Sequence, residues 1–334
     1  MSVADRPLNV RRGGVAIARL LIIVIIWCCL LVPLSALAQG NPVPRVGILT
    51  VAGGLSVDAF IRGLQALGYV DGKNIIIEQR LAGTPDRLPI VAAELVKLKV
   101  DVIFAPATAN VKAARGATST IPIVFAGVAD PVGSGFATSL ARPGGSITGL
   151  TAINAELGPK RIQLLKETVP RLARVGYLYE SSDAVSSLAL PEMETGARSL
   201  GVSVLKVDLR GADGLGAAFA GMTRDGVGAI VTGGGLFRFR AQIAELATRH
   251  RLPVLGDSRL WVEAGALLAY GASYEDLALR AASYVDRILK GVKPGELPIE
   301  RPTRFEFLVN LKSAKALGLT VPAAVLVRAD KVLD

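Results

Sequence analysis

Cysteine and histidine are nearly absent from this chain, and their scarcity excludes several kinds of chemistry. The only cysteines, Cys28 and Cys29, lie in an apolar run near the N-terminus. The rest of the chain therefore offers neither a disulfide framework nor a thiolate metal site. The single histidine, His250, sits between Arg249 and Arg251, where a surface position is expected. Zinc and other soft-metal sites are not expected in such a chain.

Nucleotide-binding loops and catalytic sets are missing too. The segment 68–74, GYVDGKN, is one residue short of a phosphate loop and ends in asparagine. The glycines of 133–135 lack the third glycine of a dinucleotide fingerprint, because Thr138 stands in its place. A serine hydrolase needs a histidine base oriented by a carboxylate, and no carboxylate pair can be assigned acid and base roles. The sequence favours a binding protein without a cofactor over an enzyme.

The N-terminus has the order of a secretory signal peptide. Arginines precede an apolar run, Leu20–Leu34, which ends in Ala36-Leu37-Ala38; the arginines are Arg6, Arg11, Arg12 and Arg19. This basic, apolar, small-x-small order predicts a signal peptide over 1–38, cleaved after Ala38, and export to the periplasm. The alternative is a membrane anchor, but a spanning helix needs about 20 apolar residues. Arg11-Arg12 leaves the twin-arginine route open beside the general one.

Basic side chains moderately outnumber acidic ones. The whole chain carries a net +10, and the mature chain keeps 34 basic and 27 acidic side chains, a net +7. The excess is spread along the chain rather than clustered. We therefore expect a basic soluble surface and no nucleic-acid partner.

The stretch 121–135, IPIVFAGVADPVGSG, is the most informative one. Ile121–Phe125 reads as a buried strand, followed by an elbow of small residues, Ala126–Ala129, and then Asp130. Ligands of open parallel sheets bind outside the carboxyl ends of the strands, so Asp130 is a candidate site residue. The alternative is that Asp130 only caps the turn that follows.

Strands and helices alternate around this stretch. Three further strands are predicted at 45–51, 74–79 and 100–105. One helix starts at Ser56 and points Phe60, Leu64 and Leu67 inward; another opens at Pro85-Asp86 and points Ile90, Leu95 and Leu98 inward. The alternation indicates a doubly wound parallel sheet.

The pattern then restarts. The segment 174–179, RVGYLY, repeats the Arg-Val-Gly of 45–47, and a second α/β unit follows. Extra pieces at 266–270, 273–289 and 305–310 do not form a third unit, which suggests that the chain crosses between lobes several times. The predicted fold is α/β, two doubly wound Rossmann-like lobes joined by a multi-crossing hinge. The N-terminal lobe is predicted over 43–152 plus 271–298, and the C-terminal lobe over 153–270 plus 299–334.

The order of motifs resembles a known family. From 45 to 333 the chain is similar to ABC transporter substrate-binding proteins of the type I periplasmic-binding-protein fold, in the branch with tryptophan- and tyrosine-binding members. The blocks that carry the resemblance are RVGIL at 45, FIRGLQALGYVDGKNIIIE at 60, DRLPIVAAELVKLKVDVI at 86, ATSTIPIVFAGVADPVGSGFATSLARPGGSITGL at 117, GPKRIQLLKETVP at 158, YVDRILKGVKPGELPIE at 284 and NLKSAKALGLTVP at 310.

The resemblance implies a monomeric two-lobed receptor that takes a small polar organic solute, amino-acid or aromatic-acid-like, and delivers it to a membrane permease and its ATPase. Its ligand would lie between the lobes. The matching positions of the N-terminal lobe are Thr50, Leu55, Ala107, Thr108, Val128 and Asp130. Those of the C-terminal lobe are Tyr179, Glu180, Ser181, Gly233, Gly234 and Asp257, with Tyr270 at the return crossing.

Roles for these residues follow from their chemistry. Thr108 and Ser181 precede predicted helices, so their backbone N–H groups and hydroxyls suit a ligand carboxylate. Asp130 or Asp257 would meet a ligand ammonium. Tyr179 and Tyr270 offer flat apolar faces, in a chain that is only 5% aromatic, unless they pack in the lobe cores.

Two loops depart from the family's pattern. Ala105-Pro106-Ala107 stands where members often carry Gly-Thr, and the loop after Tyr179, ESSDAVSS, lacks a common Asn-Pro. Two other functions stay open beside transport: an extracytoplasmic sensor that presents the solute to a membrane kinase or chemoreceptor, and a secreted enzyme on the same fold.

Overall fold

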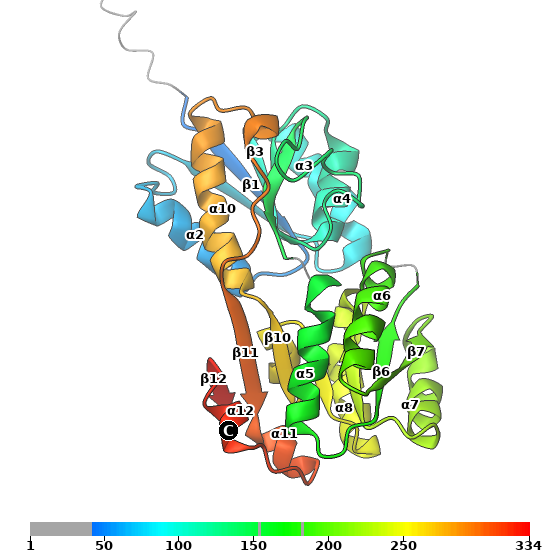
Figure 1. Cartoon of the computed structure of the whole chain (residues 1–334). Helices are drawn as coiled ribbons and strands as arrows, with labels where there is room; N and C mark the ends of the chain where they lie inside the picture. The colour runs from blue at the N-terminus through cyan, green and yellow to red at the C-terminus, as the bar shows by residue number, and fades with distance from the viewer. Residues whose placement is uncertain (1–41, 153–154, 182–183) are drawn as a thin grey trace, which may run out of the picture. The chain divides into compact units, whose positions relative to one another are not determined.

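The computed structural model describes residues 42–152, 155–181 and 184–334. The predicted signal peptide, its cleavage after Ala38 and both cysteines lie outside these residues. Two β-sheets make up the described part of the chain, and each has helices on both faces (Figure 1). Among the described residues, no helix combines the length and apolar composition needed to cross a membrane.

The first sheet is entirely parallel. Its order is β2-β1-β3-β4-β5, with bounds β1 Arg45–Thr50, β2 Ile76–Leu81, β3 Val102–Ala105, β4 Ile123–Val128 and β5 Ile147–Thr151. The central strands are buried on both faces, which explains why β3 and β4 read as apolar runs rather than as alternating patterns. All five carboxyl ends therefore meet at one edge of this sheet.

Helices from distant parts of the chain cover this sheet. One face carries α2 Leu55–Ala66 and α10 Tyr274–Leu289, and the other carries α3 Leu88–Lys97 and α4 Thr108–Ala117 (Figure 1). On the first face, Phe60 of α2 stacks on Phe104 of β3 with ring centroids 3.9 Å apart. Packing of helices on both faces buries the strands and forms the hydrophobic core of this half.

The second sheet repeats the same order and then extends it. Its order is β12-β11-β10-β9-β8-β6-β7, with bounds β6 Arg174–Tyr179, β7 Ser203–Asp208, β8 Ala229–Thr232, β9 Val254–Gly256, β10 Leu268–Ala272, β11 Phe305–Asn310 and β12 Lys331–Leu333. All neighbours are parallel except β10 and β11. Strands β7-β6-β8-β9-β10 thus match β2-β1-β3-β4-β5 of the first sheet.

The helices of the second sheet also lie on two faces. Helices α5 and α6 contribute to one core and α7 and α8 to the other. Their bounds are α5 Gly158–Thr168, α6 Ala184–Ser199, α7 Leu215–Arg224 and α8 Arg240–His250; three shorter helices are α9 Arg259–Glu263, α11 Leu311–Ala316 and α12 Ala323–Leu326.

The repeated Arg-Val-Gly sequence has a packing reason. Gly47 of β1 and Gly176 of β6 each face a side chain of the helix that follows the next strand. A Cβ at Gly47 would lie 3.0 Å from Leu95 of α3, and one at Gly176 would lie 2.7 Å from Met222 of α7. Glycine lets that helix approach the first strand of each unit, since a larger residue would overlap the buried side chain.

Several local predictions are wrong. Leu67 and Ile90 were expected to face inward, but they are 45% and 59% exposed. Helix α2 ends at Ala66, before Leu67. Helix α3 begins at Leu88 after a 3-10 turn, so its buried side starts two residues before Ile90. Strands β5 and β12 were not predicted at all.

The predicted elbow after Phe125 is also wrong in its bounds, because β4 continues to Val128. Its pairing with β5 shifts register between Ala126 and Val128. Gly127, between them, has φ 120°, a conformation that favours glycine. The small residues Ala126 and Gly127 therefore form a β-bulge inside β4 rather than a loop after it.

Candidate functional site

The predicted N-terminal site residues lie in the last position of a strand of the first sheet or in the segment that follows one, at the carboxyl edge of the sheet. Thr50 ends β1, Ala107 and Thr108 follow β3, and Asp130 follows β4. The chain order of this sheet reverses between β1 and β3. That switch point is where open α/β sheets leave a crevice for ligands.

The hydrogen bonds of this edge are largely local. Thr50 is buried and its Oγ1 donates to the carbonyl of Ala52 at 2.9 Å. Thr108 is half-buried and opens α4, whose first turn has no side-chain cap. Leu55, at the start of α2, is exposed. Thr108 and Leu55 thus present accessible surface at the edge, whereas the Thr50 hydroxyl is already engaged.

Asp130 caps the turn that follows it. Its Oδ1 accepts a hydrogen bond from the Gly133 N–H at 2.8 Å, and a Cβ at Gly133 would lie 2.0 Å from Oδ2. Asp130 stays half-buried, so its carboxylate is not sealed from solvent. Val128, by contrast, is wholly buried in the hydrophobic core of the sheet, so its side chain takes no part in the exposed edge.

The second sheet gathers its site residues around the switch point between β6 and β8. Tyr179 ends β6, and its ring stacks on Tyr177 with centroids 5.2 Å apart and planes 7° from parallel. Gly233 directly follows β8; a Cβ there would lie 2.4 Å from Ser186 Oγ and 3.1 Å from Tyr179 Cβ. Glycine therefore keeps the two strand ends close, and Gly234 then begins a 3-10 helix, Gly234–Phe239.

Ser181 has a different partner from the one expected. Its backbone N–H and its hydroxyl donate to the two carboxylate oxygens of Asp208 at the end of β7, each at 2.8 Å. These bonds hold the pKa of Asp208 below its ordinary value. The donors predicted to bind a ligand carboxylate are already bound to a carboxylate of the protein.

A charged pair joins the β6 and β8 ends. Glu180, directly after β6, is buried and pairs with Arg238 of the 3-10 helix. Glu180 is one of the site residues predicted above, whereas Arg238 is not. The only signal for it was a run of arginines and aromatics, GLFRFR, shortly after a predicted strand.

Tyr270 lies within β10 rather than at a strand end. Its ring is flanked by Phe305 and Phe307 of β11, with centroids 6.2 and 6.5 Å away. Burial raises its pKa, and the nearby Arg161 partly opposes that shift. Arg161 also donates from Nε to the Tyr270 carbonyl at 2.9 Å. Asp257 directly follows β9 and is half-buried.

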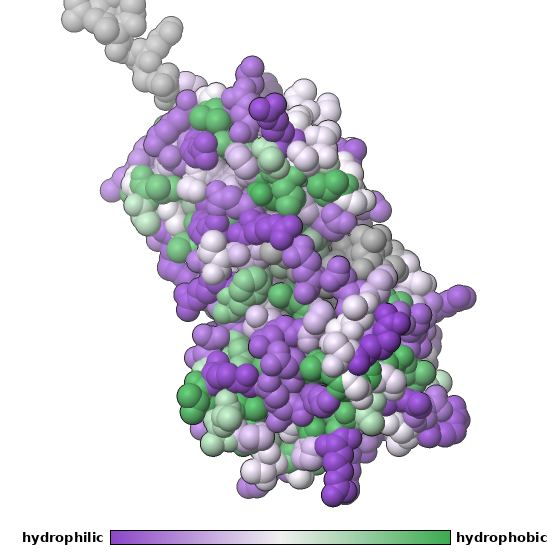
Figure 2. Space-filling view, viewed as in Figure 1, coloured by the Kyte–Doolittle hydropathy of each residue, from purple (hydrophilic) through white to green (hydrophobic). Residues whose placement is uncertain are grey.

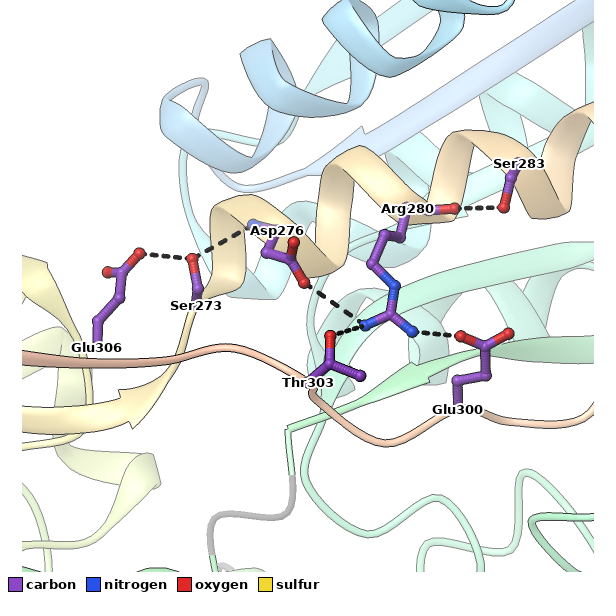
Figure 3. A network of polar contacts seen from close by, with 7 residues as sticks. All are labelled: Ser273, Asp276, Arg280, Ser283, Glu300, Thr303 and Glu306. Atoms are coloured by element: carbon purple, nitrogen blue, oxygen red, sulfur yellow. Dashed lines mark hydrogen bonds and ion pairs between the residues drawn. The ribbon is translucent and has the colours of Figure 1, made fainter.

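Polar contacts tie together the segments by which the chain passes between the sheets. Ser273, after β10, donates to Glu306 of β11 at 2.5 Å and caps α10 by accepting from the Asp276 N–H (Figure 3). Arg280 of α10 pairs with Glu300 and donates to Thr303 at 3.1 Å (Figure 3). Glu300 in turn hydrogen-bonds through its backbone to β5, where the predicted change of lobe falls.

The described surface carries no arrangement suited to a metal: no group of three or more His, Cys, Asp or Glu side chains there is placed to hold one. On the face shown in Figure 2, hydrophobic residues form small groups among hydrophilic ones. That the carboxyl edges of the two sheets bind one solute between them stays a prediction.

Solved structures share this fold, and one of them is a complex with L-Trp. A conserved domain protein from Vibrio cholerae is 27% identical and matches with a TM-score of 0.78 over 87% of this chain and all of that one. An ABC domain in complex with L-Trp from Streptococcus pneumonia is 24% identical, with a TM-score of 0.79 over the same shares. The Tyrosine-binding protein of Clostridioides difficile (strain R20291) is 26% identical over 262 residues, 78% of this chain and 75% of that protein.

The two α/β halves of matching strand order and the similarity to these solved structures show the type I periplasmic-binding-protein fold. Residues 52–333 match the family described as ABC transporter substrate binding protein, and the chain belongs to that family. Its members bind small-molecule solutes outside the cytoplasm, work with an ABC permease and are not enzymes. The predicted fold and family are confirmed.

Proposed function

We propose that this protein is the periplasmic receptor of an ABC import system. Its two lobes, 43–152 plus 271–298 and 153–270 plus 299–334, close on an amino-acid or aromatic-acid-like solute and deliver it to a permease and its ATPase. The protein acts as a monomer after removal of residues 1–38. The observation that carries the proposal is family membership over nearly the whole mature chain, together with polar and aromatic residues at the carboxyl edges of both sheets.

The ligand class is supported by chemistry and by one relative. Tyr179 provides an aromatic face at the β6 end, and Asp130, Glu180 and Arg238 provide charges of both signs at strand ends. Such a combination suits a zwitterion with an apolar or aromatic body. The similarity to a protein named for tyrosine binding points in the same direction.

Thermal unfolding with a solute panel tests this function. A ligand that binds only the folded protein, at about one hundred times its Kd, adds about 2.7 kcal/mol to stability. We expect L-tyrosine, L-tryptophan or a related aromatic acid to raise Tm by several degrees. Sugars and purines serve as controls and are expected to leave Tm unchanged. Equal Tm values across the whole panel would contradict the proposed ligand class.

A further inference from the structure

The ion pair between Glu180 and Arg238 spans the switch point of the second sheet. Glu180 comes directly after β6, and Arg238 lies in the 3-10 helix that follows β8. Strands β6 and β8 are neighbours, while the chain from β6 runs first to β7 on the other side. The pair therefore occupies the place where an open α/β sheet leaves its ligand crevice.

The two members of the pair differ sharply in burial. The Glu180 side chain is 8% exposed, whereas the Arg238 side chain is 49% exposed. A carboxylate so deeply buried is stable only with a cationic or hydrogen-bonding partner, and Arg238 supplies one. The Glu180 carboxylate thus holds the Arg238 guanidinium near the strand ends, while about half of the Arg238 side chain stays exposed to solvent.

Arg238 is also held in place from two further sides. Its Nη1 donates to the Gly235 carbonyl at 2.7 Å, and its guanidinium lies 4.4 Å from the centre of the Phe239 ring. Its other N–H groups, beyond those bound to Gly235 and Glu180, have no partner among the residues that the structure describes. A planar guanidinium with a fixed orientation and N–H groups that are still free to donate is well suited to bind a carboxylate.

We propose that Arg238 is a ligand-binding residue whose guanidinium donates hydrogen bonds to the carboxylate of the solute, and that Glu180 positions Arg238. This assignment rests on the proposed function and narrows it: the solute must carry a carboxylate, and an amine without one is rejected. It also replaces the predicted role of Ser181, whose donors are occupied by Asp208.

Calorimetric titration of the purified mature protein with L-tyrosine, L-tryptophan, tyramine and tryptamine tests the assignment. The last two probes lack the carboxylate. The unmodified protein should bind the amino acids and not the amines. Arg238→Gln should weaken amino-acid binding by about 10- to 100-fold, the loss expected for a charged hydrogen-bonding contact. Glu180→Gln should lower the preference for amino acid over amine.

Arg240→Gln is the matched control. Arg240 lies two residues away and its guanidinium is also 4.4 Å from an aromatic ring centre, that of Phe237, but no carboxylate in the described part of the chain pairs with it. This variant should bind amino acids as tightly as the unmodified protein does.

Two further variants guard against misfolding, because Arg238→Gln leaves a buried carboxylate unpaired. They are Arg238→Lys and the double variant Glu180→Gln/Arg238→Gln, and circular dichroism checks that each is folded. Both should bind amino acids more weakly than the unmodified protein.

Equal amino-acid affinities for the folded Arg238 variants and Arg240→Gln would overturn the assignment and leave the proposed function intact. Tight binding of tyramine or tryptamine by the unmodified protein would overturn it as well. Binding of none of the four probes, together with unchanged Tm for every amino acid and aromatic acid of the thermal panel, would contradict the proposed ligand class, and the carboxylate assignment with it.

Discussion

The carboxylate of Asp130 has two possible partners, the turn that follows it and a cationic group of a solute. The Gly133 N–H occupies one oxygen, and the residue is half-buried, so the second role is compatible with the first. Ser181 presents the opposite case, because both of its donors face Asp208. At the residue scale, the number of unused donors and acceptors decides which strand-end residues can bind a solute.

Asp130→Asn separates these two roles. Asparagine keeps an oxygen that accepts from the Gly133 N–H but removes the charge, so Tm should change little while affinity for an amino acid falls about tenfold. Asp130→Ala is the companion variant and should also lose about 1 kcal/mol of stability with the cap. Titration calorimetry and thermal unfolding measure both effects. Unchanged affinity in the asparagine variant would restrict Asp130 to capping.

Close packing of α2 against α10 joins segments about two hundred positions apart in the chain. A Cβ at Gly63 of α2 would lie 2.5 Å from the Leu279 carbonyl oxygen and 2.7 Å from Ala282 Cβ of α10. At the element scale, this glycine lets α10 join the first half of the molecule, although the helix directly follows a strand of the second sheet.

Gly63→Ala should therefore destabilise the protein, by about 1 to 3 kcal/mol, because the added methyl overlaps the backbone of α10. Gly116→Ala is the matched control: Gly116 is also helical, and a Cβ there meets nothing within 4 Å. That change should be neutral or stabilise by about 0.5 kcal/mol. Urea unfolding followed by circular dichroism distinguishes them. Identical midpoints would show that the helices are not in such close contact.

On the scale of the molecule, the described residues form two similar α/β halves, each built around one sheet. The chain leaves the first sheet after β5, leaves the second after β10, and rejoins the second at β11. We propose that these connections act as a hinge about which the halves close, as in receptors that bend around their ligand. The contacts of Ser273 with Glu306 and of Arg280 with Glu300 lie at two of these connections (Figure 3).

Closure around a solute should reduce the radius of gyration. Small-angle X-ray scattering of the mature protein with and without a saturating amino acid that stabilises it measures this change, because a ligand that binds both lobes shifts the population towards the closed form. A sugar that leaves Tm unchanged is the control and should leave the curve unchanged. An unaltered radius with bound amino acid would contradict closure as the coupling step.

Much of the fold could be predicted because its signals are local. Apolar runs locate β1, β3, β6 and β11, the repeated Arg-Val-Gly marks the first strand of each half, and amphipathic spacing locates α10 almost to the residue. Strands β5 and β12 were missed because their short segments carry no distinct pattern, and the phase of α3 was wrong because a 3-10 turn precedes it.

The family, the two-unit architecture and the strand ends at which binding residues are expected can all be inferred from the amino-acid sequence. Three contacts became visible in the folded chain alone: α10 packs on α2, Ser181 is bound to Asp208, and Arg238 pairs with Glu180. The difference lies in the sequence separation over which each kind of interaction acts. Periodicity and turn chemistry act over a few residues, whereas these contacts join residues 27 to more than 200 positions apart, whose partners are chosen by packing and charge in three dimensions.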